Sequence, residues 1–492
     1  MSKKIRSIYP ILAAAVLILQ FFTNARAQDI EVRIRFLPDA PTTLEVEGKF
    51  LSGKSRKNLR NLSLMTEYAG VTGLAERVSN IGFADRDGNT LTNKRFNVSE
   101  YVADGDIALF RYFVNLAPLS QRSAAAHVSW INGDAGLLML DDLMPQSNGE
   151  KVSARVKIDL PVGWEIFSPG RWASDGLFEV NDVKKASLVV GKNWREVNAG
   201  ALKLLISGQW QFTDDKAAKM AVEVFGGYAK TFGSSASQST QIALFKFPGD
   251  VPLGNWEADT RGNNITIVSS DMPFKSQSLQ RLHEQLRHEI FHLWIPNGVD
   301  LSGNYDWFYE GFALYQSLKI GVGTNRIRFD DYLDTLSRAY DIDATQAVRN
   351  SLIDASRKRW NGSNTQVYAR GMLVAFLCDL ALLERSKGKT STDKMVREIY
   401  QKYHQANTRE DGNTAIIGMM RLHAELTQII DRYITGSDKI DWRDLLAAAG
   451  IEAVAQNSVT SLRVAAKPSG RQKDLLDKLG YNNWRKLTLN NR

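Results

Sequence analysis

The sequence predicts a protein of several domains: an N-terminal β-sandwich, a mixed α+β domain, and an α-helical domain toward the C-terminus. Three observations predict this order. The chain has 492 residues, which is too many for one hydrophobic core. Apolar and polar residues alternate with the period of strands over residues 28–197, whereas strand and helix patterns mix over 198–345. Helical patterns dominate over 346–455.

The first 27 residues have the pattern of a secretory signal peptide. Basic residues at positions 3 to 6 precede an apolar run from 8 to 22, and small residues at 25 to 27 suit signal peptidase. An uncleaved membrane anchor is the alternative, but the apolar run is short for a bilayer. We expect cleavage after Ala27, a mature chain in the periplasm or secreted, and no stable membrane insertion of that chain.

The composition argues against a nucleic-acid-binding protein and against stabilisation by disulfide bonds. The formal net charge of +8 falls to +4 without residues 1–27, because Lys3, Lys4, Arg6 and Arg26 leave and no acidic residue does. This small, dispersed excess predicts no nucleic-acid partner. Cys378 is the only cysteine, so no intramolecular disulfide can form, and its apolar surroundings predict a buried side chain. The sequence leaves the oligomeric state open.

The elements follow in order. Ile30, Val32, Ile34 and Phe36 alternate with charged residues, residues 152–160 alternate likewise, and turn clusters such as DRDGN separate such runs, as in a β-sandwich. Farther on, ALKLLISGQW, QIALFKF and NNITIVSS predict strands and Asp214–Phe232 predicts a helix. The basic segment 456–492 is expected to be a tail without a chemical role.

The stretch HEIFHLWIPN, residues 288 to 297, carries two of the six histidines. On a helix from Leu279 to Trp294, an apolar stripe forms one face and His288 and His292 lie together on the opposite face. His283 points toward the stripe and is excluded as a ligand. The members of the stripe are Leu279, Leu282, Leu286, Ile290 and Leu293.

Two histidines four residues apart on a helix can bind one tetrahedral ion, with Glu289 beside the ion. Glu310 in WFYEGFALY, eighteen residues after His292, begins a second helix that can fold back as the third ligand. Two histidines and one carboxylate leave a position for water, which the ion acidifies toward a pKa of roughly 7. Two structural histidines in a core helix are the alternative, which Glu310 disfavours. We therefore predict a catalytic Zn²⁺ site.

These motifs resemble the gluzincin metallopeptidases, in particular the aminopeptidase N family and the related glycyl aminopeptidase family. The resemblance covers about residues 200–455 and implies a thermolysin-like catalytic domain over 198–345. The segment IIDRYITGSDKIDWRDLLAAAGI favours the glycyl group. That group often carries a C-terminal PDZ module, which the residues after Ala455 are too few to form.

The resemblance also implies roles for further residues. GNWEA, Gly254 to Ala258, is similar to a substrate-binding G-x-x-E stretch ahead of an edge strand, so Glu257 is expected to bind the α-ammonium group of the substrate. Ala258 departs from the usual neighbour. VYARG matches a Y-x-x-G motif in which Tyr368 is expected to stabilise the oxyanion and Gly371 to allow close helix contact.

The sequence thus predicts a zinc aminopeptidase that acts on short peptides, with Glu289 as general base. A preference for N-terminal Gly or Ala rests on the resemblance alone. A zinc endopeptidase remains an alternative, in which Glu257 has no recognition role. A non-catalytic binding protein in which zinc only stabilises the fold is the other alternative, although a structural zinc ion does not require Glu289.

Overall fold

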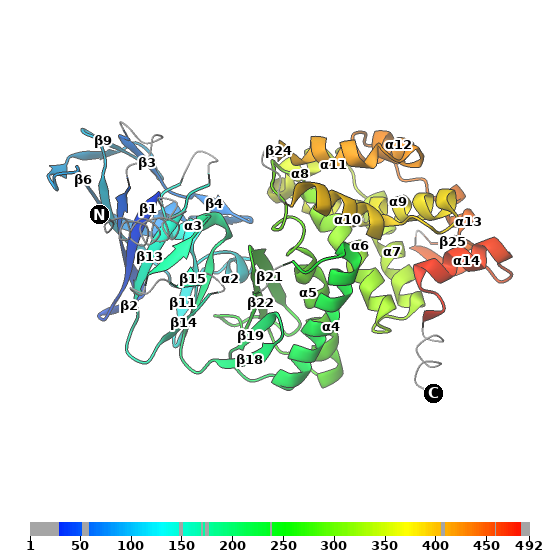
Figure 1. Ribbon diagram of the computed structural model, residues 1–492, viewed down its shortest axis with the longest axis horizontal. Helices are drawn as coiled ribbons and strands as arrows, with labels where there is room; N and C mark the ends of the chain where they lie inside the picture. Colours follow the sequence, from blue (N-terminus) through cyan, green and yellow to red (C-terminus); the bar gives the residue numbers. More distant parts are fainter. Residues whose placement is uncertain are drawn as a thin grey trace, which may run out of the picture.

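The computed structural model describes residues 29–51, 59–146, 151–168, 171–172, 177–236, 239–404, 409–457 and 459–483. The predicted signal peptide therefore lies outside the described residues. A β-rich region occupies one end of the molecule and a helical region the other, with a smaller sheet and its helices between them (Figure 1). This arrangement confirms the predicted fold class.

Two sheets of the β-rich region share one core, as expected for a sandwich. Strand β1 (Ile30–Leu37) buries Ile30, Val32 and Ile34 and exposes the residues between them, as the alternation predicts. One sheet consists of β15 (Arg171–Trp172), β16 (Phe178–Val180), β13 (Ala154–Asp159), β1, β2 (Ala40–Phe50), β10 (Leu109–Asn115), β6 (Val78–Ala84) and β7 (Thr90–Leu91), in that order. The other consists of β11 (Trp130–Asn132), β12 (Ala135–Met139), β17 (Ser187–Gly191) and β14 (Glu165–Phe167).

A five-stranded sheet forms the middle region. Its order is β18 (Arg195–Ala199), β19 (Leu202–Ile206), β20 (Thr240–Phe245), β22 (Asn264–Ser269) and β21 (Trp256–Arg261). The three strands predicted from the sequence are β19, β20 and β22, which run parallel and are largely buried. The apolar pattern did not indicate the edge strand β21, because WEADTR has no apolar alternation and owes its conformation to antiparallel pairing with β22.

Helix α4 has the predicted bounds, Asp214–Phe232. The Thr213 side chain accepts a bond from the Lys216 amide at its start, and Gly233 ends it with a φ of 77°. Helix α5 (Lys275–Phe291) ends three residues before the predicted Trp294. The chain leaves the helix at His292 because Pro296 cannot continue it and the preceding residues form tight turns.

The helices after α5 pack into the same core as the middle sheet. They include α6 (Asp306–Gly323), α7 (Phe329–Ala344) and α9 (Gly371–Ser386). The stretch Gln366–Ser386 is long and apolar enough to cross a membrane, but 94% of its most apolar window is buried inside the protein, as expected for a core helix. Cys378 lies within it and is buried, as predicted.

The segment expected to be a basic tail is folded in its described part. Strands β25 (Ile451–Gln456) and β26 (Val459–Val464) form a hairpin, and α14 (Gly470–Leu479) follows. Ser469 and Gln472 cap this helix, and Leu475, Leu476 and Leu479 are buried in the core of the helical region. The prediction of a tail was wrong because few apolar residues form the face of α14 that packs against the core, so the sequence shows no clear helical pattern there.

Candidate metal centre and substrate cleft

Helices α5 and α6 bring the three predicted metal ligands together. The ring Nε2 atoms of His288 and His292 lie 3.2 Å apart, and Oε2 of Glu310 lies 3.0 Å from the first and 3.6 Å from the second. All three side chains are buried. Among the described residues they form a group able to hold a metal ion.

The spacing of these atoms, 3.0–3.6 Å, is close to that around a tetrahedral zinc ion. Ligand bonds of the lengths found in zinc sites place neighbouring donor atoms about 3.3–3.6 Å apart. The Nδ1 atom of His292 lies 3.1 Å from the Ile295 carbonyl oxygen and donates to it, so Nε2 presents its lone pair to the centre. The donor set consists of two imidazoles and one carboxylate. Its open side faces a cavity, as in a catalytic zinc site.

A glycine contact holds Glu310 in place. Gly311 of α6 packs directly on Gly371 at the start of α9, and a Cβ built on Gly311 would meet backbone atoms of Gly371 at 2.4 Å. The two helix backbones therefore touch, as predicted for Gly371. Because Glu310 precedes one glycine and Tyr368 lies one turn before the other, this contact brings both side chains to the metal centre.

Glu289 lies beside the three ligands and has a partner that the sequence did not reveal. The Thr260 hydroxyl of β21 donates a 2.7 Å hydrogen bond to Oε2 of Glu289. Burial raises the pKa of the Glu289 carboxyl, while the nearby histidines and the bond from Thr260 oppose the rise. Thr260 thus orients the carboxylate and favours its charged form.

Replacing Thr260 with valine is expected to lower the rate of the predicted peptide hydrolysis about fivefold, which corresponds to the loss of one hydrogen bond of about 1 kcal/mol. Since this bond stabilises the charged carboxylate, its loss raises the pKa of Glu289, and the acidic limb of the pH profile of kcat/KM should move to higher pH. Thr260→Ser retains the hydroxyl and should retain the profile. An unchanged acidic limb in Thr260→Val would contradict the positioning role.

A second residue missed in the sequence, Arg359, connects the metal centre to Tyr368. Its Nη1 lies 2.9 Å from Oε1 of Glu310 and 2.8 Å from Oδ1 of Asp306, and its Nη2 donates to the Tyr368 hydroxyl at 2.6 Å. The bond from Arg359 does not consume the phenolic hydrogen, which Tyr368 can donate to an oxyanion. Burial raises the pKa of Tyr368 well above its usual value, so the phenol stays protonated.

Arg359 also sets the charge of Glu310. Burial alone would raise the pKa of Glu310, but the charge of Arg359 and the bonds to the two histidines hold this pKa well below its usual value. Glu310 is therefore an anionic ligand. No motif in RKRWNG indicates this role, because it depends on a contact between residues 49 positions apart in the sequence.

Glu257 lies in the same cleft, on β21 itself, one residue after its start, and not ahead of an edge strand as expected. The cleft has a volume of about 1200 Å³ and is also lined by His288, Glu289 and Tyr368. Gly254 lies just outside β21 with a φ of 80°, and the structure records no contact between it and His288, Glu289 or Tyr368.

The Glu257 carboxylate already has a partner, which was also missed. Arg122, from the loop before α2 (Ala124–His127) of the β-rich region, donates to it at 2.6 Å and to the Asn255 side chain at 2.7 Å. The Arg122 side chain is 59% exposed. A substrate ammonium group at Glu257 would have to share the carboxylate with this arginine or displace it. The stretch LSQRSAAA does not predict the ion pair between Arg122 and Glu257, because these two residues are 135 positions apart.

Comparisons with known proteins identify solved structures with a similar fold. No family model matches the sequence, and no curated protein matches it. Among solved structures, an aminopeptidase N family protein from Idiomarina loihiensis is similar with a TM-score of 0.72 and 15% identity, over 90% of this chain and 82% of that one. The M1 zinc metallopeptidase of Deinococcus radiodurans has a TM-score of 0.55 and 15% identity, over 84% and 94%.

The leukotriene A4 hydrolase of Saccharomyces cerevisiae is similar over 90% of this chain and 69% of its own, with a TM-score of 0.50 and 12% identity. These structures share the arrangement of a β-rich region, a middle α+β region and a helical region. This chain has the fold of the aminopeptidase N family and the M1 zinc metallopeptidases.

Proposed function

We propose that this protein is a zinc-dependent aminopeptidase that removes N-terminal residues from short peptides. The observation that carries the proposal is the group of His288, His292 and Glu310 at a cleft that also contains Glu289. The fold supports it, because the similar structures are those of zinc metallopeptidases. A mutant of the Deinococcus radiodurans protein was crystallised with a Tyr-Ser-Ala substrate, which supports peptides as the substrate class.

Each side chain of the site has a role in the proposed reaction. A Zn²⁺ ion held by His288, His292 and Glu310 would supply the Lewis acidity that activates water and polarises the scissile carbonyl. Glu289, held by Thr260, takes a proton from the attacking water and delivers it to the leaving amine. Tyr368 donates its phenolic hydrogen to the oxyanion, a contribution on the order of 3 kcal/mol for one such donor.

Recognition of a free N-terminus is assigned to Glu257. A carboxylate with a side chain only 16% exposed favours an ammonium group over the neutral amide of an internal residue. The approach of the substrate ammonium group would displace the exposed guanidinium of Arg122 from this carboxylate. A preference for small N-terminal residues, and membership of the glycyl aminopeptidase group, stay predictions from the sequence motifs.

The ion pair between Arg122 and Glu257 favours a second candidate, a zinc endopeptidase of the same fold. A carboxylate neutralised by arginine attracts an ammonium group less strongly, and Arg122 itself repels one. In this candidate the roles of the metal ligands, Glu289 and Tyr368 are unchanged. Location in the periplasm or outside the cell is proposed from the N-terminal pattern alone.

Hydrolysis of alanyl and glycyl dipeptides and of their N-acetylated counterparts distinguishes the two candidates. We expect the mature protein to cleave only the free-amine substrates, to lose activity with a chelator and to regain it with Zn²⁺. A loss of at least tenfold on acetylation corresponds to about 1.4 kcal/mol or more from the contact with Glu257. Equal cleavage of blocked and free peptides would establish the endopeptidase, and cleavage of neither by zinc-loaded protein would contradict the aminopeptidase.

A further inference from the structure

The cleft contains a buried cation that the proposed mechanism does not use. Arg287, next to His288 on α5, is 5% exposed and lines the cleft. Its Nε and Nη1 atoms are buried and have no hydrogen-bond partner among the described residues. No carboxylate of the described part of the chain forms an ion pair with it. A buried charge without a partner costs folding free energy, and such a cost is typical of a binding site.

The neighbouring carboxylates are each held by another arginine. Glu284 pairs with Arg281 at 3.0 Å, and Asp331 pairs with Arg328 at 2.8 Å. Arg326, which also lines the cleft, pairs with Glu223 at 2.7 Å. His283 and Glu284, on the same helix, also interact electrostatically with Arg287. The exposed Asp334 and Arg338 line the same cleft, and Arg338 donates to Thr335.

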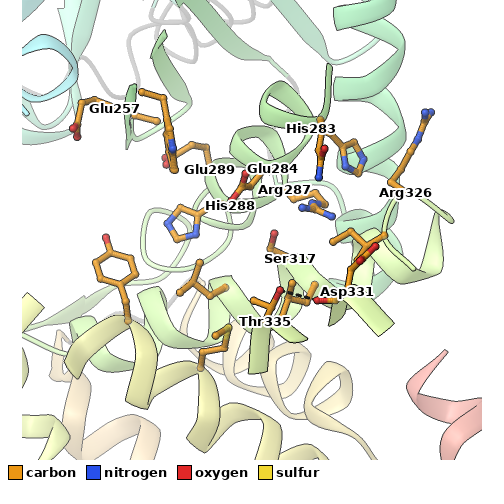
Figure 2. A pocket seen from close by; sticks show the side chains of 18 of the residues that line it. Glu257, His283, Glu284, Arg287, His288, Glu289, Ser317, Arg326, Asp331 and Thr335 are labelled. Atoms are coloured by element: carbon orange, nitrogen blue, oxygen red, sulfur yellow. Dashed lines mark hydrogen bonds between the residues drawn. The ribbon is translucent and has the colours of Figure 1, made fainter. Parts of the chain in front are cut away.

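The fold makes room for the guanidinium group. A Cβ on Gly321 of α6 would lie 1.9 Å from Nη1 of Arg287, so only glycine leaves this space open. The side chain of Arg287 projects toward the part of the cleft where Ser317 and Thr335 lie (Figure 2). Positive charge and hydroxyl groups from three helices thus surround one recess beside the metal centre.

The position of this recess indicates which part of a substrate it contacts. His288 lies between Glu257 and Arg287 (Figure 2). If Glu257 binds the amino end of a peptide, the portion that leaves after cleavage extends toward Arg287. A guanidinium matches a carboxylate in charge and in hydrogen-bonding geometry. Because Nε and Nη1 of Arg287 are enclosed, Nη1 against Gly321, Nη2 is the donor left to meet a substrate in the cleft.

We propose that Arg287 binds a carboxylate of the leaving portion of the substrate, and so selects peptides that carry one just beyond the scissile bond. This inference rests on the proposed peptidase function. Two sources have the same chemistry: the C-terminal carboxylate of a very short peptide, or an acidic side chain at the residue after the scissile bond.

Binding without turnover tests the proposal. Zinc-loaded full-length protein with Glu289→Gln is titrated calorimetrically with Ala-Ala and Ala-Ala-amide, and with Ala-Glu-amide and Ala-Gln-amide. We expect the carboxylate-bearing member of at least one pair to bind tighter by about tenfold to a hundredfold, as for a charge-assisted hydrogen bond. The first pair reports on the C-terminus and the second on an acidic side chain.

Adding Arg287→Met should reduce this ratio to about one, and Arg287→Lys should restore part of it. Arg338→Met, at an exposed arginine on the rim of the same cleft, is the matched control and should keep the ratio. The melting temperature of the Arg287→Met protein should be equal or higher, because an unpaired buried charge is removed, so a folding defect would be visible separately.

The outcomes separate this inference from the function on which it rests. Equal binding of acid and neutral peptides, or a ratio that survives Arg287→Met, would overturn the role of Arg287 and leave the peptidase proposal intact. Failure of all four peptides to bind would overturn both.

Discussion

Replacing Glu289 with glutamine is expected to lower the rate of peptide hydrolysis by about 10²–10⁴-fold, the range for loss of a general acid–base group. Glutamine has nearly the same shape and still offers an oxygen to Thr260, but it cannot accept the proton of the attacking water. Zinc content should stay stoichiometric, because Glu289 is not among the three clustered ligands.

Stability should be equal or higher in this variant, since burial disfavours the charged form of Glu289 and glutamine is neutral. The measurements are kcat on a free dipeptide, zinc by elemental analysis, and thermal unfolding. Glu284→Gln is the matched control on the same helix: its side chain is 49% exposed and paired with Arg281, and its rate should be close to that of the unmodified protein. A Glu289→Gln protein that keeps more than about a tenth of the rate would contradict the mechanism.

Replacing Glu310 with alanine is expected to abolish metal binding and to lower the free energy of unfolding by about 3 kcal/mol. The substitution removes one of three ligands and also one of the carboxylates that neutralise the buried Arg359. Arg359 keeps Asp306 as a partner at 2.8 Å, so the expected cost lies at the low end for breaking a buried ion pair.

Zinc stoichiometry and urea unfolding, each with and without a chelator, measure the two effects. A chelator should destabilise the unmodified protein, because an ion that binds only the folded state stabilises it, and should leave Glu310→Ala unaffected. His283→Gln is the control: His283 is buried on the same helix, but its Nε2 atom lies 3.7 Å from a carboxylate oxygen of Glu223 and it is not one of the three clustered ligands, so this variant should keep the full zinc content. Stoichiometric zinc in Glu310→Ala would show that another residue completes the site.

The metal centre was predictable because its geometry is local. Two histidines four residues apart face the same side of any α-helix, and the glycines of E-G-F and Y-x-x-G allow the helix contact that delivers Glu310 and Tyr368. The end of α5 was less predictable. The apolar stripe continues past Phe291, but the turns before Pro296 end the helix, and His292 still reaches the centre from its C-cap.

The residues that tune the site were not predictable from sequence. Thr260 reaches Glu289 only because β21 pairs with β22 and packs beside α5, and WEADTR by itself does not resemble a strand. Arg359 and Arg122 reach Glu310 and Glu257 across long separations in the chain, and neither lies in a recognisable motif. Likewise, the folded end of the chain depends on three leucines whose burial requires the preceding helices.

By itself, the sequence determined the order of the regions, the three metal ligands and the candidate base, because helical and strand periods and the spacing of ligands on one helix are local properties of the chain. Only the tertiary structure decided which charges meet in the cleft: Arg359 with Glu310, Arg122 with Glu257, and Arg287 with no partner among the described residues. Those pairings depend on distances between separate elements, and in a buried site such distances decide whether a charge is neutralised or left for a substrate.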